Sequence, residues 1–422
     1  MNKRWVQLAG SLVAMLMIAN LQYAWTLFVR PIQESTGWKL SEIQWGFTLF
    51  ILCETWVMPL EGWLIDRIGP RVFISIAGVL CGIGWTGLGF IHTLAGLYGF
   101  YALAGVGAAF VYSGSIAAAL KWFPDKRGLA AGIIAAGFGS GSAVFIPIIA
   151  SIIRRQGYRE AFVYTGIIQG IIIVLAAQVL RKPAPELAGW KPASLTSAPR
   201  VRRNSEQFTT AEMLRTPHFY LLYAMFVMMA TGGLLVTAQA GPVAREWNIG
   251  MAALTTALAF DRVANGASRI FWGWFSDRLG RENTMAIAFL LQAVCLISVV
   301  EWGRLSGTWF TISLVLTFFT WGEVFSLFPS TVGDYYGARN ATSNYCFLYS
   351  AKGVASIIGG GCGALLFERF GTWSAAFYGS AALALLSSLF ALLLKRTPLP
   401  AKSLQGSLPL AQNNQPVTGP RS

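Results

Sequence analysis

Twelve long apolar runs leave this chain few ways to fold. A helix rises about 1.5 Å per residue, so roughly 20 apolar residues in a row cross the hydrocarbon core of a bilayer. The short alternating segments of a membrane β-barrel are absent from the sequence. We therefore predict an all-α polytopic membrane protein with twelve transmembrane spans, at about 8–29, 43–65, 72–91, 95–120, 128–151, 161–180, 219–240, 253–275, 284–303, 308–332, 343–366 and 374–394.

Composition and charge agree with a membrane protein. Only 12% of the 422 residues are charged, whereas about a quarter is usual in soluble proteins. The net charge of +14 does not indicate a nucleic-acid partner, because the basic residues flank alternate connections, as at 3–4, 67–71, 181–215 and 395–396. The opposite side carries one basic cluster, at 154–159. By the positive-inside rule, both termini and the central loop are expected in the cytoplasm.

A repeated segment divides the chain into two halves. GWLIDRIGPR at 62–71 follows the second run, and GWFSDRLGR at 273–281 follows the eighth. Parallel repeats of six spans imply a pseudo-twofold axis along the membrane normal, with a substrate path between the halves. The predicted units are a six-helix bundle, a cytoplasmic linker, a second six-helix bundle and a disordered cytoplasmic tail, at 1–180, 181–218, 219–396 and 397–422.

The charged residues of the two repeated segments are candidate gating residues. A single copy could act only as a topological anchor at the membrane surface. Two copies at matching places favour a gate, in which ion pairs form in one conformation and break in the other. The residues concerned are Asp66, Arg67, Arg71, Asp277, Arg278 and Arg281.

Charged residues inside the apolar runs need a function, because a charge at the centre of a membrane costs roughly 2.5–3.5 kcal/mol on insertion scales. If all of them were ionised, the acidic residues would cancel the basic ones and leave no charge for a ligand. Either Asp261 pairs with Arg262 and the other carboxylates face elsewhere, or one carboxylate binds a proton. The residues are Glu54, Asp261, Arg262, Arg269, Glu323 and Lys352.

The repeated segments and the plan of six plus six spans resemble the major facilitator superfamily. Within it, six segments look like the bacterial oxalate:formate antiporter family, which is related to the monocarboxylate transporters. The resemblance implies a bacterial inner-membrane carrier that works as a monomer and is not an enzyme. The segments are QYAWTL at 22–27, KWFPDKRGLAAG at 121–132, EMLRTPHFY at 212–220, FWGWFSDRLGR at 271–281, FTWGEVFSLFPST at 319–331 and AKGVASIIGGGCGA at 351–364.

By this resemblance, Arg269 and Lys352 are the two cations that hold oxalate. The chemistry of a small dicarboxylate agrees, because it has charge at both ends and little apolar surface. The alternative is that Asp261 and Glu323 neutralise the two cations. Aromatic and amide side chains are expected to line the cavity, although packing alone would also explain each aromatic residue. These are Gln22, Tyr23, Tyr112, Trp321 and Tyr349.

The sequence departs from that family at five of these positions. Phe138 and Phe325 stand where the antiporter has tyrosines, so two hydrogen-bond donors are lost. At three other positions this chain has a carboxylate where the antiporter has a neutral residue. These are Glu54, Asp261 and Glu323.

The predicted function is exchange of oxalate for formate by alternating access, with the dianion between Arg269 and Lys352. A proton-coupled monocarboxylate transporter is the alternative that the extra carboxylates favour. A membrane enzyme or receptor is remote, since only His92 and His218 could serve as histidine bases and neither has a metal-ligand neighbour. No cofactor or metal is expected, and the expected partners are small organic anions and the lipid bilayer.

Overall fold

The computed structural model describes residues 3–123, 127–182, 201–337 and 339–402; the side chains of 60, 62, 63, 66, 127–129 and 131 lie outside this description. Over those residues the chain is helical, without strands. The first half contains α1 (Lys3–Tyr23), α2 (Trp25–Thr36), α3 (Leu40–Trp56), α4 (Met58–Ile68), α5 (Pro70–Gly87), η1 (Leu88–Phe90), α6 (Leu94–Trp122), α7 (Arg127–Ser140), α8 (Ser142–Gln156) and α9 (Tyr158–Ala177).

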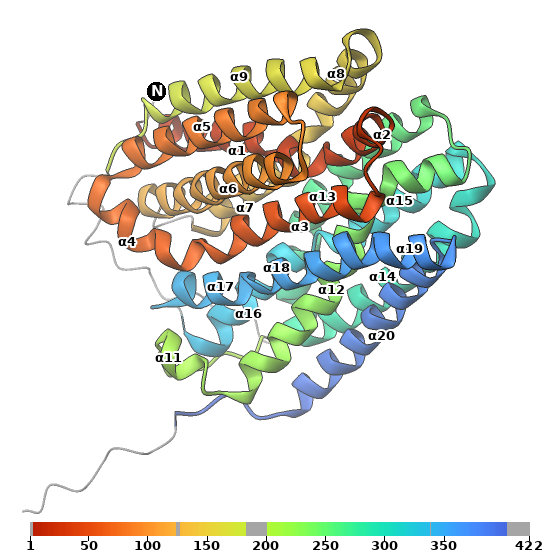
Figure 1. Ribbon diagram of the computed structural model, residues 1–422. Coiled ribbons are helices and arrows are strands. Elements are labelled where there is room, and N and C mark those ends of the chain that lie inside the picture. The colour runs from red at the N-terminus through yellow and green to blue at the C-terminus, as the bar shows by residue number, and fades with distance from the viewer. Residues whose placement is uncertain (1–2, 124–126, 183–200, 338, 403–422) are drawn as a thin grey trace, which may run out of the picture.

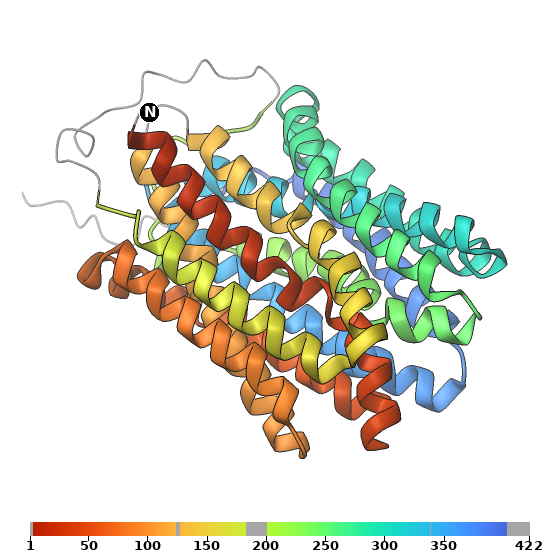
Figure 2. The same cartoon turned by 90° about the horizontal axis from the view of Figure 1, so that it is seen from above.

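The second half repeats this plan after the short helix α11. Figures 1 and 2 show the red-to-yellow helices of the first half on one side and the green-to-blue helices of the second half on the other. The elements are α11 (Thr210–Met213), α12 (Pro217–Glu246), α13 (Met251–Leu279), α14 (Arg281–Glu301), η2 (Gly303–Leu305), α15 (Gly307–Trp321), α16 (Val324–Tyr336), α17 (Ala341–Tyr349), α18 (Ala351–Ser356), the π-helical turn η3 (Ile357–Cys362), α19 (Gly363–Phe370) and α20 (Ser374–Arg396).

Each predicted span corresponds to one helical rod, by which we mean either a single helix or consecutive helices that together follow one predicted span. The prediction of twelve spans in two six-helix bundles is therefore confirmed. Ten rods in the described part of the chain are long and apolar enough to cross a membrane by length and composition. Two rods are not among these ten: one is formed by α3 and α4 together, and the other is α13. They also carry five of the nine buried charged residues of the described chain, namely Glu54 on α3, Glu61 on α4, and Asp261, Arg262 and Arg269 on α13. Low hydropathy and buried charge therefore mark the same two rods.

Five rods are interrupted part-way along their length in the described part of the chain. The interruptions fall at Ala24, Val57, Gly141, Gly322–Glu323 and Ser350, where one helix ends and the next begins at once. A broken helix frees backbone groups and changes the direction of its side chains, and such breaks commonly surround the substrate site in transporters built from repeats.

The repeated segments have the same backbone geometry in both halves. Gly69 ends α4 with φ 83° and ψ 159°, and Gly280 ends α13 with φ 91° and ψ 154°. Each glycine N–H donates to the carbonyl four residues earlier, at 2.9 Å to Ile65 and 3.0 Å to Ser276. Positive φ is easy for glycine and costly for other residues, so the two glycines make equivalent sharp turns into the next span.

The halves meet through equivalent rods. In the first half α3 packs on α18, η3 and α19, and in the second half α13 packs on α7 and α8. Side chains also bond across the boundary: Gln44 Nε2 donates to the Ala238 carbonyl at 2.7 Å, and Thr48 Oγ1 donates to the Ser356 carbonyl at 3.0 Å. Polar groups therefore hold the two halves together beside the interrupted helices.

Candidate functional site

The Lys352 ammonium lies at the boundary between the two halves. Its Nζ donates to Glu54 Oε2 at 2.8 Å, to Gln22 Oε1 at 2.9 Å and to the Tyr349 hydroxyl at 3.2 Å. All four side chains are fully buried. Lys352 lies just after the break at Ser350 that separates α17 from α18, while α1 and α3 supply Gln22 and Glu54 from the other half.

The partner of Lys352 differs from the expectation. Either Glu323 or Asp261 was the expected neutralising carboxylate, and neither forms an ion pair with Lys352 among the described side chains. Glu54 takes that role from α3, so it does not face away from the site. Sequence spacing could not show this pair, because its members lie 298 positions apart in different halves.

Arg269 is bonded differently. Its Nη1 donates to the carbonyl of Ala135 on α7 at 2.8 Å, so this side chain too crosses between the halves. Within the described structure, Nε and Nη2 are buried without a hydrogen-bond partner, and no carboxylate pairs with the guanidinium. Buried unpartnered donors are rare in folded proteins and each needs an explanation. The free edge of Arg269 can bind an anion.

One aromatic ring lies beside both cations. The Phe325 centroid is 4.5 Å from Arg269 Cζ and 5.8 Å from Lys352 Nζ. The Phe138 centroid lies 5.5 Å from the same Nζ. These two phenylalanines, noted in the sequence only as departures, thus sit next to the charged groups. Their rings exclude water, and their faces attract cations.

The other predicted lining residues surround this cluster. Tyr112 stacks on Tyr349 with centroids 5.5 Å apart, and Trp321 meets Phe325 edge-on at 5.1 Å. Tyr23 contacts Phe138 at 5.3 Å. The indole N–H of Trp321 is buried and has no partner in the part of the chain described. The structure therefore brings all seven predicted substrate-binding residues to one enclosed region.

Arg262 forms a separate unit on α13. Its guanidinium pairs with Asp261 and lies between the rings of Tyr23 and Phe318, with Cζ 4.2 Å and 3.8 Å from their centroids. Asn265 Nδ2 donates to the Tyr23 hydroxyl at 3.3 Å. The pair of Asp261 with Arg262 was one of the two alternatives expected from the sequence, the other being a protonated carboxylate. Because Asp261 is paired in this way, it does not neutralise Arg269.

Two further carboxylates lie in the buried interior. Glu323 stands at the break between α15 and α16, and both of its oxygens lack a hydrogen-bond partner among the described atoms. Glu61 on α4 is 2% exposed and accepts a hydrogen bond from Ser113. Sequence analysis missed Glu61, because it lies close to the uncertain end of the second span.

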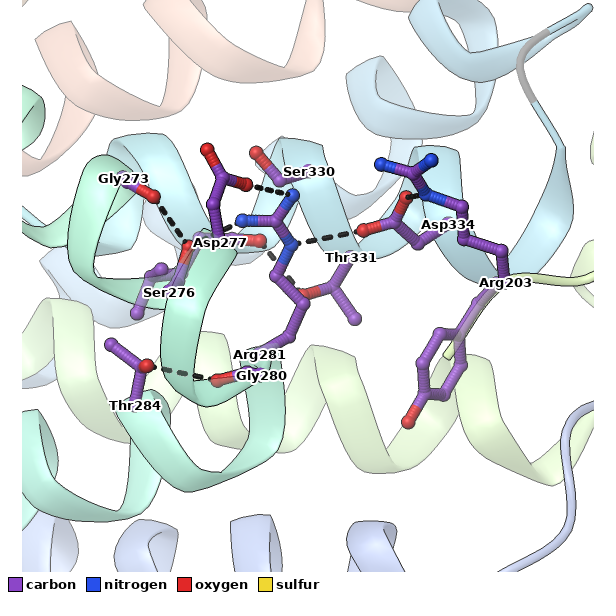
Figure 3. A network of polar contacts seen from close by, with 12 residues as sticks. Arg203, Gly273, Ser276, Asp277, Gly280, Arg281, Thr284, Ser330, Thr331 and Asp334 are labelled. Carbon is purple, nitrogen blue, oxygen red and sulfur yellow. Dashed lines mark hydrogen bonds and ion pairs between the residues drawn. The ribbon is translucent and has the colours of Figure 1, made fainter. Parts of the chain in front are cut away.

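The second repeated segment forms an ionic network (Figure 3). Arg281 pairs with Asp277 at 2.8 Å and with Asp334 at 2.9 Å, and it donates to Ser276. Arg203 of the linker pairs with the other oxygen of Asp334 at 3.2 Å. Asp334 and Arg203 were not predicted. Asp334 directly precedes YYGARN at 335–340, which weakly repeats WFPDKRG at 122–128 in the first half, and that position was the available signal.

Of the remaining predicted gating residues, Arg278 and Arg71 have contacts outside this network. Arg278 stacks on Trp274, with Cζ 3.8 Å from the ring centroid, and Arg71 donates to Gln178 Oε1 at 2.8 Å. Arg67 is exposed, and the side chain of Asp66 lies outside the described residues. Among the described side chains, the network joins α13, α14, α16 and the linker, and it does not reach the first half.

The comparisons with known proteins agree with this architecture. The "Oxalate:formate antiporter" of Oxalobacter formigenes is 38% identical over 377 residues, which cover 89% of this chain and 88% of that protein. "Monocarboxylate transporter 12-B" of Danio rerio is 22% identical over 409 residues, covering 91% and 85%. "Apicoplast pyruvate carrier 1" of Toxoplasma gondii is 21% identical over 377 residues, covering 76% and 68%.

A family model described as the Major Facilitator Superfamily matches residues 10–359 and, in a second match, residues 221–419. The first match alone spans well over half of the chain. Together with the twelve rods, the duplicated turns and the central polar site, it shows that this chain belongs to the major facilitator superfamily.

Proposed function

We propose that this protein is a secondary transporter that exchanges small carboxylates across a membrane, with oxalate and formate as its substrates. Two findings support the proposal. One is the similarity to an oxalate:formate antiporter over most of both chains. The other is the pair of cations, Arg269 and Lys352, buried between the halves beside one aromatic ring.

The observation that carries the proposal is the free edge of Arg269. A carboxylate can accept two parallel hydrogen bonds from the Nε and Nη2 side of a guanidinium, and this geometry is strong and specific. Both of these donors are buried and unpartnered in the described structure. A second carboxylate of the same substrate would then lie toward Lys352, and the rings of Phe138, Phe325, Tyr112 and Tyr349 would confine it.

Transport would follow from the position of the site between the halves. Gln22, Glu54 and Tyr112 come from the first half, and Arg269, Trp321 and Lys352 come from the second. A substrate bound among these residues contacts both halves, so its binding favours conformations in which the halves close around it. Opening at alternate ends then exposes the site to each side of the membrane in turn.

Counterflow in proteoliposomes tests this function. Vesicles loaded with unlabelled formate should accumulate labelled oxalate transiently, and Arg269→Gln or Lys352→Gln should abolish the uptake. Arg154→Gln, at the exposed end of α8, is the matched control and should transport normally. Uptake at the wild-type rate by the folded Arg269→Gln variant would overturn the assignment of the site.

Proton-coupled monocarboxylate transport is the second candidate. The buried, unpartnered carboxylate of Glu323 and the extra carboxylate of Glu54 favour it, since either group could carry a proton. The test uses vesicles without internal anion. Uptake of labelled lactate or pyruvate that follows an imposed pH gradient supports symport, whereas uptake that requires internal formate supports exchange.

The orientation follows the distribution of basic residues. We place the termini and the linker in the bacterial cytoplasm, the protein in the inner membrane, and the transport function in the monomer. Residues 1–180 and 219–396 would move as the two units, with 181–218 as the linker. Of the tail expected to be disordered at 397–422, residues 397–402 form hydrogen bonds with the segment at 202–218, and residues 403–422 lie outside the described part of the chain. Labelling of cysteines introduced near Lys3 and Lys402 in intact cells and in broken cells tests this orientation.

A further inference from the structure

Glu54 is the one carboxylate that contacts a site cation in the part of the chain described. It lies on α3 of the first half, its side chain is fully buried, and its Oε2 is 2.8 Å from Lys352 Nζ. Its other oxygen, Oε1, is buried without a hydrogen-bond partner in the described structure. The ion pair therefore crosses between the halves inside the proposed substrate site.

We propose that Glu54 is an internal substitute for a substrate carboxylate, so that the site takes a monocarboxylate at Arg269 while Glu54 remains on Lys352. A dicarboxylate binds both cations only by displacing Glu54. This inference rests on the proposed function and specifies how one site accepts anions that carry different charges.

The donors of Lys352 support this assignment. An ammonium group has three N–H donors, and Gln22, Glu54 and Tyr349 accept from Nζ. An incoming carboxylate must therefore replace one of these acceptors. If it replaced Gln22 or Tyr349, two carboxylates would face each other across one ammonium in a buried site, which is unfavourable. Replacement of Glu54 exchanges one carboxylate for another.

The charges around the site also support a monocarboxylate at Arg269. Asp261 is paired with Arg262, and Glu323 forms no ion pair with either site cation among the residues described. With Glu54 on Lys352, Arg269 is the cation without a carboxylate, and its charge matches one anionic carboxylate. Besides Lys352, the ionisable groups of the described chain that interact with Glu54 electrostatically are Arg269, Glu61 and four tyrosines, namely Tyr23, Tyr101, Tyr112 and Tyr349.

Displacing Glu54 from Lys352 costs free energy, and whether this cost arises depends on how many carboxylates the substrate carries. A carboxylate removed from its cation and left buried is strongly unfavourable. A dicarboxylate bears this cost, whereas a monocarboxylate that binds at Arg269 does not. Oxalate and oxamate separate the two cases, because they have nearly the same size and oxamate carries an amide in place of one carboxylate.

The experiment measures binding of oxalate, oxamate and formate to the purified full-length protein by calorimetry, together with self-exchange in proteoliposomes. The Glu54→Gln variant keeps the size of the side chain and an acceptor for Lys352 but removes the charge. Its preference for oxalate over oxamate should exceed that of the wild type by at least about 10-fold, equivalent to about 1.4 kcal/mol.

Glu61→Gln is the matched control, because Glu61 is a buried carboxylate of the same span that contacts Ser113 and not Lys352. The oxalate-over-oxamate preference of this variant should stay within about twofold of the wild-type value, well below the change of about 10-fold expected for Glu54→Gln. An equal oxalate-to-oxamate preference in wild type and Glu54→Gln would overturn the inference. Should Glu54→Gln fail to fold, a wild-type preference for oxalate over oxamate of more than about 10-fold would overturn it too.

The failure of this inference can be distinguished from failure of the proposed function. If Arg269→Gln abolishes transport while Glu54→Gln leaves the preference unchanged, the carboxylate site stands and the role of Glu54 is wrong. If the folded wild type binds none of the three anions, the proposed function itself is wrong.

Discussion

Arg269 on α13 donates a hydrogen bond to the backbone carbonyl of Ala135 on α7, at 2.8 Å, and so joins the second half of the protein to the first. The same guanidinium keeps Nε and Nη2 free for a ligand. An anion bound at that edge would fix the orientation of the guanidinium and hence its bond to α7. Substrate binding and the contact between the halves therefore share one side chain.

Arg269→Lys should reduce oxalate transport by about 100-fold or more, although the positive charge is retained. Lysine is a point charge without the planar fork, so it cannot hold Ala135 and a bidentate carboxylate together. The expected loss corresponds to about 3 kcal/mol, the upper value for a hydrogen bond to a charged group. Initial rates of counterflow measure it, and transport within threefold of the wild type would exclude a bidentate role.

Gly139→Ala should impair transport by displacing Arg269. A Cβ at position 139 would lie 3.1 Å from Arg269 Nε and 3.3 Å from the Cα of Gly266 on the facing helix. One of these neighbours must move, and the guanidinium is the more mobile of the two. Oxalate affinity, measured by calorimetry, should fall by about 10-fold, a difference of about 1.4 kcal/mol.

Gly379→Ala is the control for that experiment, because a Cβ at position 379 would meet nothing within 4 Å. It should leave affinity and transport unchanged. Equal affinities of Gly139→Ala and the wild type would show that Arg269 does not need its present position to bind the anion.

The number of spans could be predicted from the sequence because hydropathy is a local property. A run of apolar residues such as 219–240 is recognisable without knowledge of its neighbours. The equivalence of Gly69 and Gly280 was also predictable, since both segments repeat the same residues at the same spacing. Helix breaks such as that at Ser350 were not predicted, because the sequence around 350 contains no proline and the break depends on packing.

The pairing of the buried charges was only partly predictable. Asp261 and Arg262 are adjacent in sequence, so their pair was one of the expected alternatives. Glu54 and Lys352 meet only because α3 packs on α18 across the two halves. The cost of buried charge indicates that such residues need partners. It does not indicate which partners, since that depends on how the rods are arranged.

Asp334→Asn should destabilise the ionic network at the end of α16. Asp334 pairs with both Arg281 and Arg203, and its side chain is only 12% exposed. Removing the carboxylate charge breaks the ion pair of Arg203 and leaves Arg281 with the more exposed Asp277 as its carboxylate partner. We expect the free energy of unfolding to fall by about 1–3 kcal/mol, which is typical of a partly buried charge that loses its partner. A lower melting temperature in detergent, measured by intrinsic fluorescence, would show it.

Glu301→Gln is the control for the network. Glu301 pairs with Arg304 at 3.7 Å and accepts a hydrogen bond from the exposed Tyr378 hydroxyl, and both members of the ion pair are about half exposed. The amide oxygen of glutamine can still accept from Tyr378. Exposed pairs contribute about 0–1 kcal/mol, so the melting temperature should barely change. Equal melting temperatures of Asp334→Asn and Glu301→Gln would show that the network does not stabilise this conformation.

Glu368→Gln should favour opening of the protein at the end opposite the linker. There a hollow of about 710 Å³ lies between the ends of α2, α3, α12 and α19, and Glu368 is part of its lining. Glu368 Oε1 accepts from the Ser41 backbone N–H at 2.8 Å, and Oε2 accepts from the Ser41 hydroxyl at 2.9 Å. These bonds hold α19 of the second half to the first turn of α3.

The carboxylate charge strengthens both bonds and interacts favourably with the positive end of the α3 dipole. The neutral amide accepts through one oxygen only, so the contact between the halves should weaken by about 1 kcal/mol. Distances between spin labels at exposed residues near the ends of α2 and α12 should then shift toward longer values. Glu246→Gln, in the same hollow, is the matched control, since the described structure shows no ion pair or hydrogen bond from its carboxylate to the other half. Unchanged distance distributions in Glu368→Gln would mean that Ser41 and Glu368 do not hold this end closed.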